Sequence, residues 1–289
     1  MKAVSIDYDK CNVCSVCIQT SRTCFSKKGG RIEIEADDKT CMLCGHCVAA
    51  CPSAAITHNI MGMSNFPAIE KGKLIRTDDL VRLIRERRSH RSFTKKKLRK
   101  QDIEKLVDTV RYAPTGHNDQ TVELIIIQNP ERRKSLSDLA VDFCAVIAKQ
   151  NAEKLASLRA NGKGSPEEIA QLEEVVEFRR MLVQARDAGF DPLLYEAPAV
   201  AIFHSTTQTA TPKDNCVIAA TTMGLLARTM GLATTYIALF EHAGNYYAPL
   251  RDELGLPQGH KVFSVLVIGY PKIKYLRAVD RKPTRTRWE

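Results

Sequence analysis

Residues 41–52 carry the sequence CMLCGHCVAACP. Its first three cysteines are each separated by two residues, and a fourth follows after three more, directly before Pro52. Such a triplet can wrap one face of an iron–sulfur cube, and the fourth cysteine, turned away by the proline, reaches a neighbouring cube. The spacing therefore predicts a cluster-binding segment, and we interpret the rest of the chain from it.

A second cysteine set precedes the first and brings the assigned cysteines to eight of ten. It consists of Cys11, Cys14, Cys17 and Cys24. The two sets resemble the cluster motifs of bacterial two-cluster ferredoxins, and the resemblance covers about the first 60 residues. It implies crossed ligation, with Cys11, Cys14, Cys17 and Cys51 on one 4Fe-4S cluster and Cys41, Cys44, Cys47 and Cys24 on the other. The first motif departs from the family pattern, because six residues separate Cys17 from Cys24 and Phe25 replaces the proline.

Two other uses of these cysteines remain open. Two structural zinc ions would also use eight thiols, but zinc sites favour pairs of CxxC, and a CxxCxxC triplet crowds one tetrahedral ion. Disulfides would require an oxidising compartment, and residues 1–7 show no apolar signal segment. Iron–sulfur ligation is therefore the favoured prediction.

Length and composition predict a soluble protein of two domains. With 289 residues the chain can hold a module of about 60 residues and a domain of about 200. No apolar run approaches the roughly 20 residues of a membrane span, so we expect a cytoplasmic protein without membrane contact.

The net charge of +10 raises the question of a nucleic-acid partner. Much of the excess lies between Arg82 and Lys105, where Phe93 is the lone aromatic residue and no nucleic-acid module is recognisable. We expect no nucleic-acid binding. An anionic cofactor or substrate, or an acidic electron-donor protein, accounts for the charge more simply.

Hydrophobic periodicity places elements along the whole chain. Short strands are expected at 2–7, 31–35 and 55–58, and the Gly- and Pro-containing segment 61–76 is the predicted linker. A helix is expected to start with Thr77 as its cap and to present Leu80, Val81, Leu83 and Ile84 as an apolar stripe. A second helix is expected at 101–111, followed by a strand at 122–127.

The arrangement of RRSHRSF (87–93), a helix, APTGHNDQ (113–120) and a strand resembles the start of the nitroreductase family of flavin enzymes. Downstream segments match the same family: a strand at 197–203, a long helix at 214–230, and strands at 231–236 and 262–270. The resemblance implies an α+β fold, with a ferredoxin-like module (1–60) followed by a nitroreductase-like FMN domain (77–289). It also implies a homodimer holding FMN at the subunit interface.

Residues 131–190 form a helical insertion in that pattern. Two or three charged helices are expected, around 132–149, 151–160 and 165–186, with Ser165 as a cap and Pro166 at the first helical position. The insertion is either a lid over the flavin or a peripheral helical pair.

The family resemblance assigns FMN-binding roles to particular residues. Arg87, Arg88, Ser89 and Arg91 match positions that hold the phosphate and the pyrimidine edge. Pro114 and Thr115 match a turn near the isoalloxazine, and Asn118 a side-chain amide at the flavin's polar edge. Ala238 and Leu239 match backbone amides near N5, and Arg281 a C-terminal phosphate ligand. No catalytic acid or base can be named.

The predicted function is that of an iron–sulfur flavoprotein oxidoreductase. Electrons from reduced ferredoxin or another one-electron donor would pass through the clusters to FMN, and on to a small oxidised substrate. Nitroaromatics, quinones, activated alkenes and halogenated aromatics are candidate acceptors. The alternatives are an electron-transfer or redox-sensing flavoprotein serving a protein partner, and a zinc-containing nucleic-acid binder.

Overall fold

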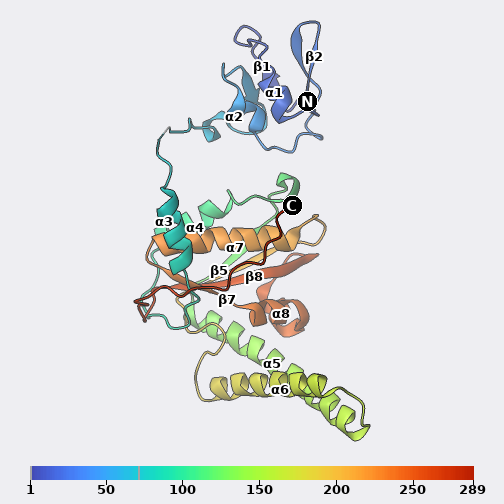
Figure 1. Cartoon of the computed structure of the whole chain (residues 1–289), viewed down its shortest axis with the longest axis vertical. Coiled ribbons are helices and arrows are strands. Elements are labelled where there is room, and N and C mark those ends of the chain that lie inside the picture. Colours follow the sequence, from blue (N-terminus) through green and yellow to red (C-terminus); the bar gives the residue numbers. More distant parts are fainter. Residues whose placement is uncertain (1, 71) are drawn as a thin grey trace. The chain divides into compact units, whose positions relative to one another are not determined.

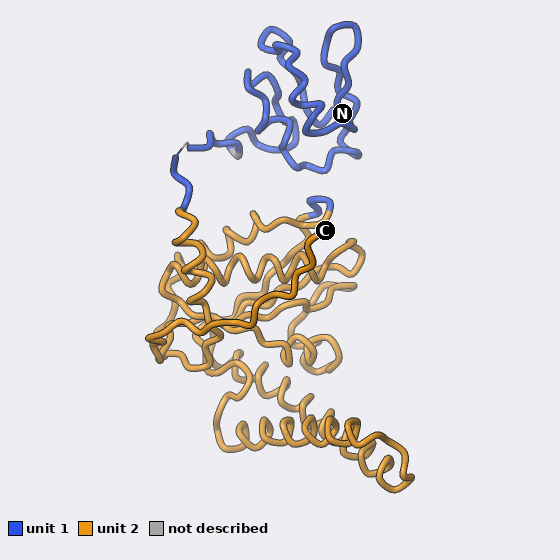
Figure 2. Tube along the Cα trace, viewed as in Figure 1, with its two compact units in different colours: residues 1–75, 117–119 blue, residues 76–116, 120–289 orange. Residues whose placement is uncertain are grey.

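The structure, a computed structural model, describes residues 2–70 and 72–289. Met1 of the predicted module and Lys71 of the predicted linker lie outside the described residues. The chain forms two compact units, coloured blue and orange in Figure 2. Unit 1 runs to Ile75 and includes His117–Asp119, and unit 2 comprises Arg76–Gly116 and Gln120–Glu289.

Unit 1 contains two short, two-stranded antiparallel sheets and two one-turn helices. Strand β1 (Val4–Ile6) pairs with β4 (Ile56–His58), and β2 (Phe25–Lys28) pairs with β3 (Arg31–Ile34). The two helices are α1 (Val16–Thr20) and α2 (His46–Ala50), and a 3-10 turn, η1 (Met63–Asn65), follows β4. Three of these strands lie within the predicted ranges, whereas β2 was missed.

The turn between β2 and β3 explains why the missed strand forms. Gly29 and Gly30 both have positive φ angles, 53° and 78°, which a tight two-residue hairpin turn requires. Phe25, 2% exposed, fixes the register by entering a small core with Val4, Ile32 and Ile56. The Gly-Gly pair was therefore a usable signal for this hairpin.

Unit 2 is built on a four-stranded antiparallel sheet of order β5-β6-β8-β7. Its strands are β5 (Glu123–Ile127), β6 (Ala199–Thr206), β7 (Ala233–Tyr236) and β8 (His260–Gly269). The central strands β6 and β8 are covered on both faces, which explains their nearly continuous apolar sequences.

Helices cover both faces of this sheet (Figure 1). One face packs on α4 (Lys100–Val110) and α7 (Pro212–Thr229), and the other on α5 (Pro130–Ala160), α8 (Ala238–Tyr246) and α9 (Ala248–Leu254). The small residues Ala219 and Ala220 of α7 are fully buried and let this helix approach the sheet closely. The long helix predicted at 214–230 is confirmed as α7.

The insertion is a helical hairpin of α5 and α6 (Pro166–Asp187) that projects from unit 2 in Figure 1. Of the two or three predicted helices, two form, because no glycine or proline interrupts the chain at residues 149–151 and α5 continues through them. Helix α6 begins as predicted, with the Ser165 side chain accepting from Glu168 N at 3.1 Å. An ion pair between Lys154 and Glu168, at 3.0 Å, crosses the hairpin.

Asp191 fastens α5 to the loop before β6. Its carboxylate accepts hydrogen bonds from Ser137 Oγ at 2.6 Å, from Leu194 N at 2.9 Å and from Glu196 N at 3.0 Å. Arg133 Nε lies 3.9 Å away, and the two charged side chains are only 14% and 10% exposed. One buried carboxylate thus holds both a helix and a turn.

Helix α3 (Thr77–Glu86) differs from its prediction in two respects. Arg76, not Thr77, is the N-cap residue, since Thr77 already has helical geometry. The predicted apolar stripe is largely exposed, at 39% for Leu80 and 52% for Ile84, because no element of the described chain covers it. Among the described residues, no helix has the length and apolarity needed to cross a membrane.

Candidate functional site

Eight cysteines of unit 1 line two separate cavities, four in each. The first cavity is lined by Cys11, Cys14, Cys17 and Cys51. The second is lined by Cys24, Cys41, Cys44 and Cys47. Each cavity therefore combines the triplet of one set with the fourth cysteine of the other set: Cys51 joins the Cys11 triplet, and Cys24 joins the Cys41 triplet. Four thiols around one cavity can ligate zinc or an iron–sulfur cluster.

The two triplets have the same backbone geometry, thirty residues apart. Val13 and Leu43 have φ angles of 56° and 51°, and Ser15 and Gly45 have φ angles of 65° and 68°. Left-handed conformations are costly for a β-branched residue such as Val13, and such strain concentrates at ligand-binding loops. These alternating turns point the three cysteines of each loop toward one centre.

Burial controls the protonation of the thiols. Burial raises the pKa of Cys47 to about 11 and also raises the pKa of Cys17. Burial would likewise raise the pKa of Cys51, but hydrogen bonds from Ala55 N, at 3.3 Å, and from Ser53 outweigh it and lower the pKa. Buried thiolates require a nearby positive charge, which a bound metal supplies.

His58 makes a defined contact with the second cavity. Its Nδ1 atom accepts hydrogen bonds from Ile60 N at 3.2 Å and from Met61 N at 3.1 Å. Burial lowers its pKa, so the neutral ring carries its proton on Nε2. Nε2 lies 3.7 Å from Cys41 Sγ, and His58 is therefore a donor to this sulfur.

In unit 2, the segment that contains Arg87, Arg88 and Arg91 runs along the edge strand β7. Ser89 forms a bridge with Thr234, whose carbonyl accepts from His90 N at 3.2 Å. Arg91 is exposed and Arg87 and Arg88 are half-buried, so their guanidinium groups can reach a bound anion. Forked guanidinium donors suit a phosphate.

The predicted backbone donors lie just beyond the same strand. Ala238 and Leu239 open α8, where the first amides of a helix lack intrahelical acceptors and are free to bind a ligand. Glu241 follows in the first turn, and burial raises its pKa despite the opposing charge of Lys213. This partly buried acid was missed by the sequence analysis, which found no candidate proton donor.

The turn that contains Pro114 and Thr115 lies at the other edge of the sheet. It leads into β5, and Gly116 N donates to Asn215 Oδ1 at 3.0 Å. Strands β5 and β7 are separated by β6 and β8, a distance of about 14 Å at normal strand spacing. Within one chain this turn and the arginine segment therefore lie at opposite edges of the sheet.

The other two predicted FMN ligands, Asn118 and Arg281, lie outside the arginine segment and the Pro114 turn. Asn118 belongs to unit 1, and its Nδ2 atom donates to Met42 O at 2.9 Å. Arg281 is exposed in the C-terminal segment, and its backbone N donates to Asp280 Oδ1 at 2.9 Å. Cys144 and Cys216 lie outside both cysteine sets and are fully buried. Cys144 Sγ accepts a hydrogen bond from Arg179 Nη1 at 3.2 Å.

Unit 2 is therefore an α+β domain whose sheet carries a cationic segment and free helix amides along one edge. The model of the nitroreductase family matches residues 84–270, and the chain belongs to that family. The family resemblance predicted from sequence is confirmed for this part of the chain, and membership makes the protein an oxidoreductase.

Individual relatives are distant. A curated protein of Archaeoglobus fulgidus, named provisionally as an NADH dehydrogenase or NAD(P)H nitroreductase, is 24% identical over 68% of this chain and 87% of its own. A Bacillus subtilis protein named NAD(P)H FMN reductase is 30% identical over 22% of this chain and 25% of its own.

Solved structures share the fold. A nitroreductase from Bacteroides fragilis, solved with bound FMN, has a TM-score of 0.53 and 21% identity, and covers 74% of this chain and 100% of its own. A second nitroreductase structure, from Desulfitobacterium hafniense and also with bound FMN, has a TM-score of 0.52 and 19% identity. The match covers 75% of this chain and 100% of that one.

Proposed function

We propose that the protein is an iron–sulfur flavoprotein oxidoreductase. In this proposal unit 1 holds two 4Fe-4S clusters, and the nitroreductase domain binds FMN and reduces a small oxidised substrate. The observation that carries the proposal is the pair of four-cysteine cavities in a chain that also contains a nitroreductase domain.

The cysteine cavities fit clusters better than single zinc ions. Each loop turns three closely spaced thiols inward through left-handed residues and receives its fourth thiol from the other motif. This is the ligand exchange of two-cluster ferredoxins. The His58 Nε2–H group adds a hydrogen bond to a ligand sulfur, a contact that tunes cluster potential.

The edge of β7 fits FMN. Arg87, Arg88 and Arg91 would bind the phosphate, while the first amides of α8 would donate to the flavin ring. FMN supplies the exchange between one-electron and two-electron chemistry, which tethered clusters require. Glu241 lies in the first turn of this helix, and burial raises its pKa, which favours its protonated form.

We also propose that the active form is a homodimer with FMN at the interface. Pro114 and Thr115 lie at the sheet edge opposite the arginine segment. In a dimer, the second copy would supply this turn to the site formed by the first copy's arginine segment. The exposed apolar residues of α3 are available for such an interface.

Metal analysis tests the clusters. Anaerobically purified protein should contain about eight iron and eight sulfide per chain. Cys24→Ala should damage the cluster held by Cys41 and its two triplet partners, while the other cluster stays cubic by electron paramagnetic resonance. Stoichiometric zinc without iron would refute the proposal, and loss of the other cluster would reverse the ligand assignment.

Anaerobic stopped-flow reduction tests the electron donor. Reduced ferredoxin, or a chemical one-electron donor, should reduce FMN through the clusters faster than NADH or NADPH does. The names of the curated relatives point to NAD(P)H as the competing donor. If NADH reduces FMN at a turnover-competent rate in a variant lacking both clusters, the clusters are not the entry point. Turnover of nitroaromatic or quinone acceptors by the reduced protein then identifies the substrate class.

A further inference from the structure

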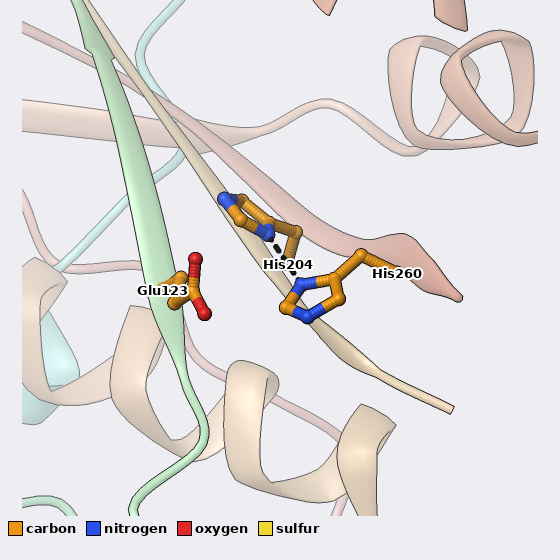
Figure 3. A group of neighbouring side chains, drawn as sticks. All are labelled: Glu123, His204 and His260. Carbon is orange, nitrogen blue, oxygen red and sulfur yellow. Dashed lines mark hydrogen bonds between the residues drawn. The ribbon is translucent and has the colours of Figure 1, made fainter. Parts of the chain in front are cut away.

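Three side chains from three neighbouring strands converge at one end of the unit 2 sheet. Glu123 comes from β5, His204 from β6 and His260 from β8 (Figure 3). One ligand atom of each lies within 4.8 Å of the others. The group lies outside the cysteine cavities and the arginine segment, and the proposed electron-transfer function does not use it.

Strand register produces this convergence. Glu123 lies directly opposite His204, and His260 lies opposite Thr206, diagonal to His204. A register shift between Phe203 and His204 sets this arrangement, because β6 and β8 lose their regular alternation there. Bulges of this kind re-aim side chains and are frequent next to functional sites.

The distances suit a shared metal ion. The two histidine Nδ1 atoms lie 3.0 Å apart. With metal–nitrogen bonds of about 2.05 Å, this N–N separation gives an N–metal–N angle of about 94°. An ideal tetrahedral angle would need an N–N separation of about 3.35 Å, so only a small shift of the rings is required. Two ligands of one ion lie at most about 4.2 Å apart, so a small rotation of the exposed Glu123 side chain completes the set.

The chemistry of the ligand set selects the class of ion. Two imidazole nitrogens and one carboxylate oxygen favour Zn²⁺ and related transition metals over Mg²⁺ and Ca²⁺, which prefer oxygen ligands. We propose that Glu123, His204 and His260 bind one divalent transition-metal ion of the Zn²⁺ class, with solvent completing its coordination. His204 is 4% exposed, so the fold holds its ring in place beside His260.

The role of this ion is structural. It links the edge strand β5 to the central strands β6 and β8, which hold the core of the sheet. Because the Pro114 turn leads directly into β5, the ion also fixes the start of that strand. Binding to the folded state alone raises thermal stability by mass action.

The test uses the full-length, anaerobically purified protein with its clusters intact. Equilibrium dialysis against Zn²⁺, followed by elemental analysis, compares wild type with Glu123→Gln, His260→Gln and the control His242→Gln, an exposed histidine of α8. We expect wild type and control to bind one zinc per chain and to melt at a higher temperature with Zn²⁺. Each ligand variant should bind zinc at least tenfold more weakly and lose that shift.

Zinc-edge X-ray absorption on the same samples identifies the ligands directly. Nitrogen and oxygen neighbours at about 2.0–2.2 Å support the site, whereas sulfur at about 2.3 Å would place the zinc on cysteines and overturn the proposal. Unchanged zinc affinity in both ligand variants, or no zinc bound by wild type, would also overturn it. Glu123 is exposed and His260 half-buried, so neither substitution should prevent folding.

Discussion

The hydrogen bond from His58 to Cys41 should set the reduction potential of one proposed cluster. An N–H donor stabilises a ligand sulfur more strongly when the cluster carries an additional electron, so the contact raises the potential. A net hydrogen bond contributes about 0.5–1.5 kcal/mol, and we take about 0.5–1 kcal/mol as the difference between the two redox states. For one electron, 59 mV corresponds to 1.36 kcal/mol, so losing the bond should lower the potential by about 20–45 mV.

Two substitutions separate the donor from the structural role of the ring. In His58→Asn, the side-chain oxygen can replace Nδ1 as acceptor for Ile60 N and Met61 N, but no donor reaches Cys41. In His58→Gln, the longer amide can place an N–H near the former Nε2 position. We expect the lower potential in the asparagine variant and a near-normal potential in the glutamine variant.

The assay is a redox titration of anaerobic protein followed by electron paramagnetic resonance, in which the two clusters are assigned with Cys24→Ala. The cluster of the Cys11 triplet should keep its potential in both His58 variants. An unchanged potential in His58→Asn, with the cluster intact, would refute the reasoning. An equal fall in both variants would indicate a packing effect instead.

Three further predictions concern unit 2. Arg88→Ala and Arg91→Ala should each weaken FMN binding about ten- to a hundredfold, measured by fluorescence titration, and unchanged affinity in both would make the segment ordinary surface. Asp191→Ala should lower the free energy of unfolding by about 3–5 kcal/mol, because it leaves a buried arginine unpaired; chemical denaturation should show almost no effect for the exposed control Asp187→Ala. Glu241→Gln should raise the melting temperature at pH 7: the folded-state pKa of Glu241 lies above its unfolded value near 4.5, so the native protein loses stability as pH rises through that window. The gain should vanish below about pH 4.5, and a variant less stable than wild type at pH 7 would contradict this sign.

The sequence-based predictions that agree best with the structure are those that depend on local residue spacing. The cysteine triplets, the Ser165 cap and the long α7 helix depend on residues close together in the chain, and periodicity or motif spacing identifies such features. The hairpin at Gly29 also had a local signal that was not used. By contrast, the possible additional helix starting at residue 151 does not form, because no glycine or proline interrupts the chain at residues 149–151 and α5 continues through them.

Contacts between distant segments could not be predicted in this way. His58 meets Cys41 only because β4 pairs with β1 beside the second cysteine loop. The Glu123–His204 pair depends on strand register, and a shift of one residue would turn each side chain to the opposite face. Periodicity also identified the stripe of α3 without indicating whether the same chain would cover it.

The sharing of cysteines between the two cavities has a consequence for how this module can be built and altered. Cys24 follows the first triplet but lines the second cavity, and Cys51 does the reverse. Neither half of the module can therefore be deleted or transplanted by itself, because each half supplies one cysteine to the cavity of the other half. Loss of the whole segment 11–24 should therefore remove three ligands from one proposed cluster site and one ligand from the other, whereas the single substitution Cys24→Ala affects one site.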